Sequence, residues 1–320
     1  MPLSRIYEQH LSGADIALLQ PIVEMQAALG HDQRDGDRVS VLRHVLARFQ
    51  SQSHHAHRSA VSDLLETKSA VSLAGISRRH SRYHAAPAKP QHRYVKIVHA
   101  TGLEAARNAK GVVVVIDVLR SFTVSAYALA GGARECLLVT TVEDALELAE
   151  QIRDATICAE ENALPIPGIA ISNSPTQVAA ANMRGRTLIQ RSTAGTPVIS
   201  AVRSDKGIFA GSLVVASATA QACLLTRPDT VTLVASADFP EDHACAKFIE
   251  AAMRGTHIDL GPLLEPLRES ERYQKVMAGR WPGFPPTDID LALAVDQFDF
   301  AMPAAKSDGH ITLTASFPSR

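Results

Sequence analysis

From residue 94 onward, two kinds of segment alternate regularly along the chain. Short apolar segments rich in β-branched residues predict strands, at residues 94–98, 112–119, 135–140, 156–159, 187–191, 214–216 and 231–235. Segments rich in alanine and other helix formers lie between them, at residues 123–130, 142–153, 175–183, 197–202, 218–225 and 242–254. Continuous apolar strands that alternate with helices are typical of a largely parallel sheet covered on both faces. The sequence therefore predicts an α/β fold with three α/β/α layers around a largely parallel or mixed sheet.

The first 93 residues follow a different pattern. Apolar residues recur at helical spacing over residues 17–25 and 41–49, whereas residues 72–93 are polar, with several arginines and prolines, as in a linker. We predict a helical or disordered N-terminal extension and linker over residues 1–93, and one α/β domain over residues 94–320. The histidine run at residues 54–57 is compatible with a metal site, but a solvated polar segment is the favoured interpretation. Nothing in this composition indicates the role of the extension.

The C-terminal part predicts structure without chemistry. A helix is expected over residues 262–279, followed by a turn at residues 281–283. A short helix at residues 288–295 and a closing strand at residues 310–315 complete the prediction.

Composition excludes some classes of function. The chain has 320 residues, with 32 Lys and Arg against 33 Asp and Glu, and this balance argues against binding nucleic acid by bulk charge. No apolar run approaches the roughly 20 residues of a membrane-spanning helix, and the first residues do not resemble a secretory signal. The four cysteines are widely spaced, which favours reduced, buried thiols in a cytoplasmic protein.

The first candidate site follows the most apolar strand, where the chain reads Asp117-Val118-Leu119-Arg120-Ser121. A buried carboxylate is costly unless a positive group faces it. A divalent cation suits Asp117, and Arg120 with Ser121 suits an anion at the start of the next helix. An internal ion pair between Asp117 and Arg120 is an equally good interpretation of this junction alone.

Two further junctions combine a helix-capping residue with proline. At Asn173-Ser174-Pro175, Ser174 is a natural N-cap and the proline suits the first helical position. The segment from Arg191 to Pro197 repeats the device, with Thr196 as the expected cap and Gly195 as the residue that supplies a positive φ in a tight turn. The free amides of two such helix starts are suited to bind an oxyanion, although capping alone also explains the pattern.

Acidic residues follow two other strands. Glu160-Glu161 offers oxygen ligands of the kind that Mg²⁺ prefers, although a solvated loop explains at least one glutamate of the pair. Asp238 and Asp242 are additional acidic candidates, and Glu241 with Asp242 also suits the start of a helix. The chain contains no P-loop, no G-x-G-x-x-G, no H-E-x-x-H and no G-x-S-x-G pattern. The commonest nucleotide-binding, zinc-hydrolase and serine-hydrolase motifs are therefore absent.

Taken in order, these junctions resemble the 2-phosphosulfolactate phosphatase family. The resemblance rests on D-V-L-R-S at residues 117–121, the two glutamates at 160–161, N-S-P at 173–175, T-A-G-T at 193–196 and G-S-L at 211–213. The acidic start of the helix near residue 241 is also similar. The resemblance covers residues 95 to 305 and leaves out the N-terminal extension.

The resemblance implies a phosphoric monoester hydrolase that depends on Mg²⁺ and converts 2-phosphosulfolactate to sulfolactate and phosphate in coenzyme M biosynthesis. It implies that Asp117 with Glu160 or Glu161 holds the metal, and that Asp117, Arg120 and Ser121 are catalytic. The residues that it places around the phosphate are Arg120, Ser121, Asn173, Ser174, Thr193, Gly195 and Thr196. Whether a phosphoenzyme forms or water attacks directly stays open, and a homo-oligomer is compatible with the family.

The chain departs from the family pattern in three motifs. It reads Ala159-Glu160-Glu161-Asn162 where the family has Gly-Glu-Arg, so the arginine is lost. Ser172 replaces a glycine, and Ala194 replaces an asparagine. These changes affect the expected substrate more than the expected phosphate or metal. We therefore expect as partner a small phosphorylated 2-hydroxy acid, and neither nucleic acid nor a membrane. The alternative is a non-catalytic phosphate-binding or regulatory protein on the same scaffold.

Overall fold

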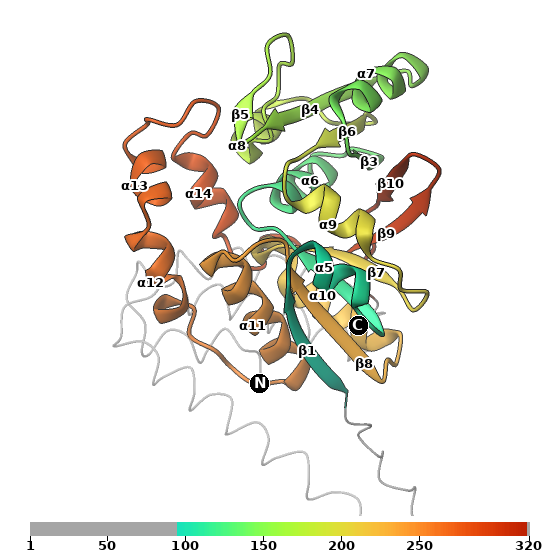
Figure 1. Ribbon diagram of the computed structural model, residues 1–320, viewed down its shortest axis with the longest axis vertical. Helices are drawn as coiled ribbons and strands as arrows, with labels where there is room; N and C mark the ends of the chain where they lie inside the picture. The colour runs from blue at the N-terminus through green and yellow to red at the C-terminus, as the bar shows by residue number, and fades with distance from the viewer. Residues whose placement is uncertain (1–94, 319–320) are drawn as a thin grey trace, which may run out of the picture. The chain divides into compact units, whose positions relative to one another are not determined.

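The computed structural model describes residues 95–318, and the predicted N-terminal extension lies outside them. Ten strands form one mixed sheet in the order β1-β8-β2-β7-β9-β10-β3-β6-β4-β5 (Figure 1). The strands are β1 (Lys96–Thr101), β2 (Val112–Ile116), β3 (Glu135–Val139), β4 (Ala155–Glu161), β5 (Leu164–Pro165), β6 (Thr187–Arg191), β7 (Ile208–Gly211), β8 (Thr230–Ala235), β9 (Met302–Ser307) and β10 (His310–Leu313).

The sheet consists of two parallel groups of strands joined by a hairpin. Strands β1, β8, β2 and β7 are parallel to one another, as are β3, β6 and β4. The hairpin β9–β10 lies between the groups and pairs antiparallel with β7 on one side and β3 on the other. The prediction of a largely parallel or mixed sheet is confirmed.

Helices cover both faces of the sheet. They are α5 (Gly102–Asn108), α6 (Ser121–Ala130), α7 (Val142–Gln151), α8 (Pro175–Ala180), α9 (Gly195–Ala201), α10 (Ala216–Leu225), α11 (Pro240–Arg254), α12 (Gly261–Glu269), α13 (Glu271–Met277) and α14 (Thr287–Ala292). Strand β2 shows the layers best, since its side chains alternate between two cores. Val113 and Val115 pack with residues of α6 and α9. Val112, Val114 and Ile116 pack with residues of α10 and α11. The three-layer prediction is confirmed.

Four segments differ from the prediction. Residues 214–216 belong to a 3₁₀ turn, η2 (Leu213–Val215), and to the start of α10, whereas the strand of this region is β7. The predicted helix over residues 262–279 is two helices, α12 and α13. They separate at Ser270, whose hydroxyl accepts the Tyr273 amide at 3.1 Å and caps α13. The hydrophobic pattern does not indicate α5 or β9.

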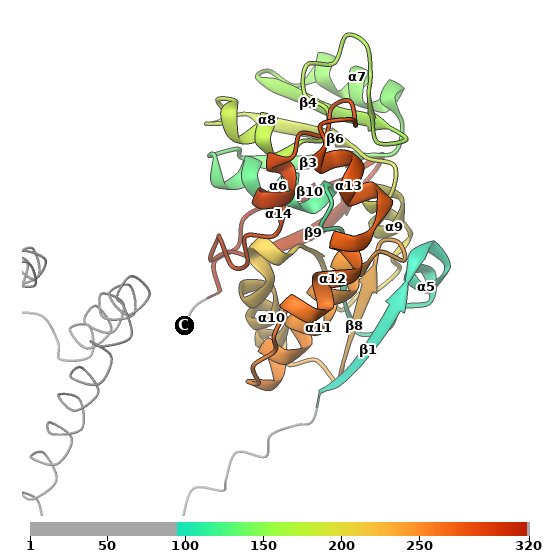
Figure 2. The ribbon, with the colours of Figure 1, turned by 90° about the vertical axis from the view of Figure 1, so that its left-hand side faces the viewer.

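The C-terminal helices connect the two groups of strands. Figure 2 shows α12, α13 and α14 following one another along one side of the described part of the chain. Helix α12 packs on α11, which belongs to the β8 side, and α14 packs on α8, which precedes β6. This segment therefore brings residues far along the chain to the ends of the central strands.

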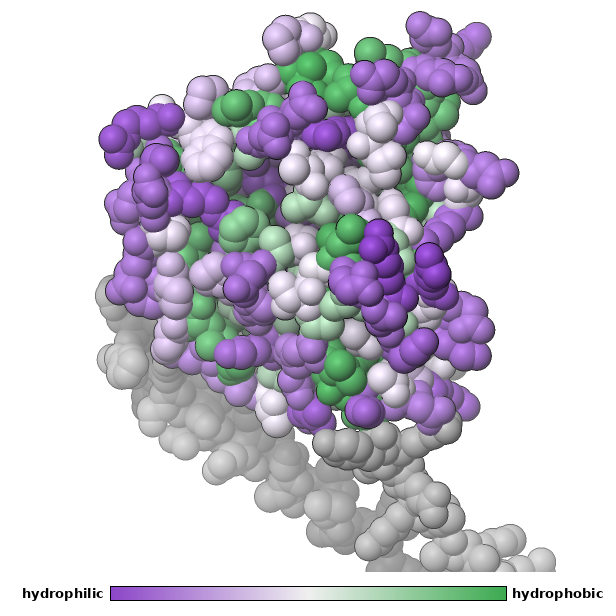
Figure 3. Space-filling model, viewed as in Figure 1, coloured by the Kyte–Doolittle hydropathy of each residue, from purple (hydrophilic) through white to green (hydrophobic). Residues whose placement is uncertain are grey.

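The surface of the described domain is mixed. Apolar side chains on the face shown in Figure 3 are scattered among polar ones. Among residues 95–318, no helix has the length and apolar character needed to cross a membrane.

Candidate active site

Asp117 lies where the central strands end. It follows β2, its amide donates to the Gly211 carbonyl at the end of β7 at 3.1 Å, and it is only 3% exposed. The Ser121 amide, at the start of α6, donates to Asp117 Oδ1 at 3.0 Å. The other oxygen, Oδ2, lies 2.6 Å from the point where a Cβ on Gly195 would stand. The first residues of α6 and α9 thus meet at the carboxylate that follows β2.

Two further carboxylates accompany Asp117. Asp242 and Glu241, in the first turn of α11, are 1% and 0% exposed. Asp242 accepts the Val118 amide at 2.8 Å and the Ser236 hydroxyl at 3.0 Å. Because strands β2 and β8 are parallel neighbours, the residues that follow them lie at the same edge of the sheet. Asp117, Glu241 and Asp242 form what we call the acidic centre.

Charge is concentrated in the acidic centre. Burial raises the pKa of Asp117 to about 6, and the carboxylates of Glu241 and Glu160 add to this effect. Burial also raises the pKa of Asp242 well above its ordinary value, with contributions from Asp117 and Glu241. A buried site that disfavours its own carboxylate charges is stabilised by a positive group.

One arginine approaches the acidic centre. Arg272 of α13 donates to Glu241 Oε1, and its guanidinium lies 4.0 Å above the ring of Phe239. Its positive charge also lowers the pKa of Asp117, against the larger effect of burial. The other oxygen of Glu241, Oε2, is buried and has no hydrogen-bond partner within residues 95–318. Among residues 95–318, the ion pair with Arg272 thus offsets the charge of one of the three carboxylates.

The donor set fits a hard divalent cation. Asp117 Oδ2 and Glu241 Oε2 are oxygen ligands of the type that Mg²⁺ prefers, and Glu241 Oε2 lacks a partner. Over residues 95–318, no three His, Cys, Asp or Glu side chains converge into a complete metal site. Mg²⁺ commonly takes one or two carboxylates and completes its shell with water and substrate phosphate, so an incomplete protein shell is compatible with it.

The structure separates the two glutamates of the predicted metal set. Glu160 is 3% exposed, but its carboxylate already accepts the amides of Ala163 and Thr193, each at 2.5 Å. The Thr193 hydroxyl adds a third bond to it at 2.9 Å. Glu161 is exposed at the end of β4, where it pairs with Leu164 of β5. Glu160 thus holds two loops together, and Glu161 lies at the solvent surface.

Arg120 and Ser174 share a protein carboxylate. Arg120 Nη1 donates to Asp288 Oδ2 at 3.0 Å, and the Ser174 hydroxyl donates to Asp288 Oδ1 at 2.7 Å. The Thr176 amide in the first turn of α8 also donates to Asp288 Oδ1, at 3.1 Å. This helix start therefore holds the carboxylate of Asp288, whereas the sequence predicts a bound oxyanion there. The predicted alternative, an ion pair between Arg120 and Asp117, is wrong, because the partner of Arg120 is Asp288.

A buried glutamine connects the remaining predicted residues. Gln190 of β6 donates from Nε2 to the Ser121 carbonyl at 2.8 Å and to Asn173 Oδ1 at 3.0 Å. Its own Oε1 accepts the Ser125 hydroxyl at 2.6 Å. Ser121, Asn173 and Ser174 are each no more than 4% exposed. The structure therefore brings Ser121 and Asn173 together, as the sequence predicts.

The start of α9 differs from its prediction. The helix begins at Gly195, so Thr196 lies inside it, and the capping hydroxyl belongs to Ser192, which accepts the Thr196 amide at 3.1 Å. Gly195 has no positive φ. Its lack of a side chain is required instead by the close approach of Asp117. Asp238 is also displaced from its predicted role, since its side chain is 92% exposed and contacts His243.

Sequence reasoning missed three residues of this region, namely Gln190, Arg272 and Asp288. Gln190 is a polar residue within an apolar strand, and this signal was available in the sequence. Arg272 and Asp288 lie in the C-terminal helices, where the sequence shows no corresponding pattern.

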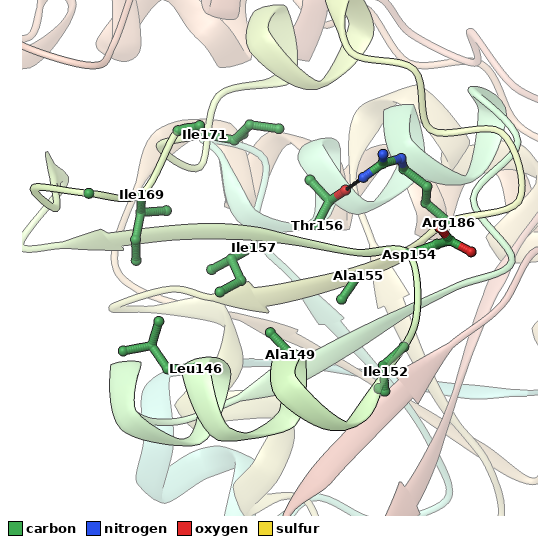
Figure 4. Close-up of a pocket in the computed structure, with 12 residues that line it drawn as sticks. Leu146, Ala149, Ile152, Asp154, Ala155, Thr156, Ile157, Ile169, Ile171 and Arg186 are labelled. Atoms are coloured by element: carbon green, nitrogen blue, oxygen red, sulfur yellow. Dashed lines mark hydrogen bonds between the residues drawn. The ribbon is translucent and has the colours of Figure 1, made fainter.

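A groove on the outer side of β4 does not belong to this site. It runs between β4 and α7 and is lined by apolar side chains that include Leu146, Ile152, Ile157 and Ile169 (Figure 4). At one end Arg186 donates to the Thr156 hydroxyl at 2.9 Å. None of the residues predicted for metal or phosphate lines it.

The fold and the site together define a three-layer α/β protein with a buried acidic centre at its strand ends. A family model described as 2-phosphosulpholactate phosphatase matches residues 98–271. The chain belongs to the 2-phosphosulfolactate phosphatase family, a family of phosphoric monoester hydrolases.

Curated relatives agree with this assignment. A probable 2-phosphosulfolactate phosphatase of Bacillus subtilis is 33% identical over 202 residues, which cover 62% of this chain and 88% of the relative. Relatives with the same description from Carboxydothermus hydrogenoformans and Thermotoga maritima are 35% and 38% identical. These two matches cover 43% and 31% of this chain, and 58% and 43% of the relatives.

Proposed function

We propose that the protein is a Mg²⁺-dependent phosphatase that hydrolyses the phosphate monoester of a small 2-hydroxy acid. The favoured substrate is 2-phosphosulfolactate, which yields sulfolactate and phosphate. The observation that carries the proposal is the acidic centre, in which three buried carboxylates lie together and Glu241 pairs with Arg272. Family membership supports the reaction class, and the description of the relatives as probable 2-phosphosulfolactate phosphatases supports the substrate.

Asp117 and Glu241 are the residues that would hold the cation. When bound, Mg²⁺ would neutralise the charge that develops on the transferred phosphoryl group. Asp242 accepts a hydrogen bond at each oxygen and thereby fixes the loop that carries Asp117. Glu160, whose oxygens accept three hydrogen bonds, fixes the loop before α9. In this proposal Glu160 and Asp242 therefore orient the site without binding the metal.

The residues around Asp117 suit a small oxyanion. Asn173 Oδ1 is occupied by Gln190, so its amide nitrogen remains as a donor. Gly195 brings backbone without a side chain next to Asp117 Oδ2. Backbone amides and amide side chains that are fixed before substrate binds stabilise developing negative charge effectively. We assign Asn173, Ser121 and the backbone at Gly195 to the phosphate.

The departures from the family pattern bear on the rest of the substrate. Ser172 is 3% exposed and lies next to Gly283, and its hydroxyl has no hydrogen-bond partner in the described part of the chain. Asn162 is exposed, and its amide donates to the Thr193 hydroxyl at 3.0 Å. Through this backbone amide, the loop that departs from the family's Gly-Glu-Arg contacts the loop of Thr193, and in this proposal it influences which small acid fits.

The test is phosphate release by the purified protein, with Mg²⁺ or with EDTA, from 2-phosphosulfolactate, phospholactate and the phosphoglycerates. The proposal predicts release that requires Mg²⁺ and that one substrate dominates. Absence of release from every substrate, with folded protein, would instead support a phosphate-binding protein on this scaffold. A cytoplasmic location, self-association and the absence of nucleic-acid or membrane partners stay predictions.

A further inference from the structure

The segment of residues 281–288, which we call the C-terminal strap, touches three loops of the site. Trp281 Nε1 donates to the Ala163 carbonyl, beyond β4, at 3.1 Å. The Gly283 carbonyl accepts from Arg120 Nη1, after β2, at 2.6 Å. Asp288 reaches the start of α8 through Ser174. The strap lies outside residues 98–271, which the family model matches.

Close packing fixes the strap. Gly283 has a φ of +67°, and a Cβ there would stand 2.5 Å from Pro165 Cγ and 2.7 Å from Ser172 Oγ. Only glycine combines this backbone conformation with so little space. The guanidinium of Arg120 lies 3.9 Å above the ring of Phe284. The strap therefore has one position relative to the loops that it contacts.

Asp288 is the point where two of those loops meet. Its side chain is fully buried, and its two oxygens accept three hydrogen bonds from two separate segments of the chain. Arg120 belongs to the loop that begins with the acidic residue Asp117, and Ser174 directly follows Asn173. A buried carboxylate with a buried arginine partner and two further donors is held in one orientation.

We propose that Asp288 is a positioning residue of the active site, which fixes the loop of residues 117–121 relative to the start of α8. Arg120 and Ser174 act through Asp288, and not as ligands of the phosphate. This inference rests on the proposed function for its catalytic consequence. Its structural consequence, the joining of two loops by one side chain, does not depend on the reaction.

The substitution Asp288→Asn tests the proposal. Asparagine keeps the shape and the bonds to Ser174 and Thr176, but it places an uncharged amide against Arg120. The expected result is a 10- to 100-fold loss of kcat/KM, since small displacements of reacting groups have effects of this size. Asp290→Asn is the matched control, because Asp290 lies on the same helix and is exposed.

A milder variant keeps the test informative if Asp288→Asn does not fold. Ser174→Ala removes one bond to Asp288 and should lower kcat/KM less. If Asp288→Asn folds, adding Ser174→Ala to it should lower kcat/KM by a smaller factor than Ser174→Ala does in the wild type. Both substitutions weaken the same connection between residues 117–121 and the start of α8. Independent effects of the two substitutions would overturn the proposed pathway through Asp288.

Hydrogen exchange of the full-length chain separates this inference from the proposed function. We expect faster exchange at residues 117–121 and 172–178 in Asp288→Asn, and in Ser174→Ala to a smaller extent, but not in Asp290→Asn. If the wild type releases no phosphate while both loops respond, the proposed function fails and the connection stands. If the wild type is active and neither variant changes kcat/KM or exchange, Asp288 is not a positioning residue.

Discussion

Gly195→Ala is the substitution that perturbs the acidic centre with the smallest change in the chain. The new Cβ would stand 2.6 Å from Asp117 Oδ2 and 3.0 Å from the Ser121 Cβ, whereas ordinary van der Waals contact begins at 3.4 Å. Asp117 or α9 must therefore move by about 0.8 Å, the gap between the two distances. A misplacement of about 1 Å at a reacting group costs about 100-fold in rate. We expect kcat/KM to fall by about 10- to 100-fold, or about 1.4 to 2.7 kcal/mol.

The effect on folding should be small by comparison. Alanine is a better helix former than glycine by about 1 kcal/mol, which offsets part of the about 1 to 3 kcal/mol that overpacking costs. Gly261→Ala is the matched control, since Gly261 is also the first residue of a helix and also lacks a positive φ. The assays are steady-state phosphate release and thermal unfolding of both variants. Activity of Gly195→Ala within twofold of the wild type would refute the proposed closeness of Gly195 and Asp117 in the working enzyme.

Four other predictions concern charge and burial. In EDTA at pH 7.5, Asp117→Asn should raise the free energy of unfolding by about 1 to 3 kcal/mol, because the pKa of Asp117 is about 6 in the folded state and 3.8 in the unfolded state. The stability that this carboxyl contributes falls as pH rises from 4 to 6. An unchanged or lower melting temperature of the variant would contradict this prediction. Mg²⁺ at 100 times its Kd should stabilise the wild type and Glu160→Gln by about 2.7 kcal/mol, but it should not stabilise Asp117→Asn. If Mg²⁺ fails to stabilise Glu160→Gln, Glu160 is a metal ligand. Arg272→Gln should move the acid limb of the pH–rate profile to higher pH, since the charge of Arg272 lowers the pKa of Asp117; a shift to lower pH would oppose this assignment. A thiol reagent should label none of the four cysteines before the protein unfolds, because all are buried and burial raises the pKa of their thiols. The cysteines are Cys136, Cys158, Cys223 and Cys245. Rapid labelling of the native protein would contradict their burial.

The hydrophobic pattern predicts most of the strands and helices, because their conformation follows from the residues within each segment. Strand β2 is five consecutive buried aliphatic residues, and its position inside the sheet, between β8 and β7, agrees with that pattern. Residues 214–216 are just as apolar but start a buried helix, and a short apolar run does not distinguish these two cases. Strand β9 contains proline and two alanines and no β-branched residue, so its pairing in the hairpin decides its conformation.

The site was predicted where it depends on strand ends and missed where it depends on distant contacts. Asp117, Ser121 and Asn173 lie at junctions that the strand–helix alternation locates. Asp288 is separated from Arg120 by 168 positions, and only the tertiary fold brings them together. The positions of the two adjacent glutamates follow from the geometry of a strand. Side chains alternate along a strand, so Glu160 points inward while Glu161 points to solvent.

The most direct test of the account compares the wild type with Asp117→Asn on 2-phosphosulfolactate, with Mg²⁺ present and with EDTA. Sulfolactate and phosphate should form in equal amounts in the wild type with Mg²⁺ alone. Asp117→Asn, shown to be folded, should release neither product under either condition. Equal turnover by the variant and the wild type, or turnover that persists in EDTA, would contradict the assignment of Asp117 to a Mg²⁺-dependent phosphatase site.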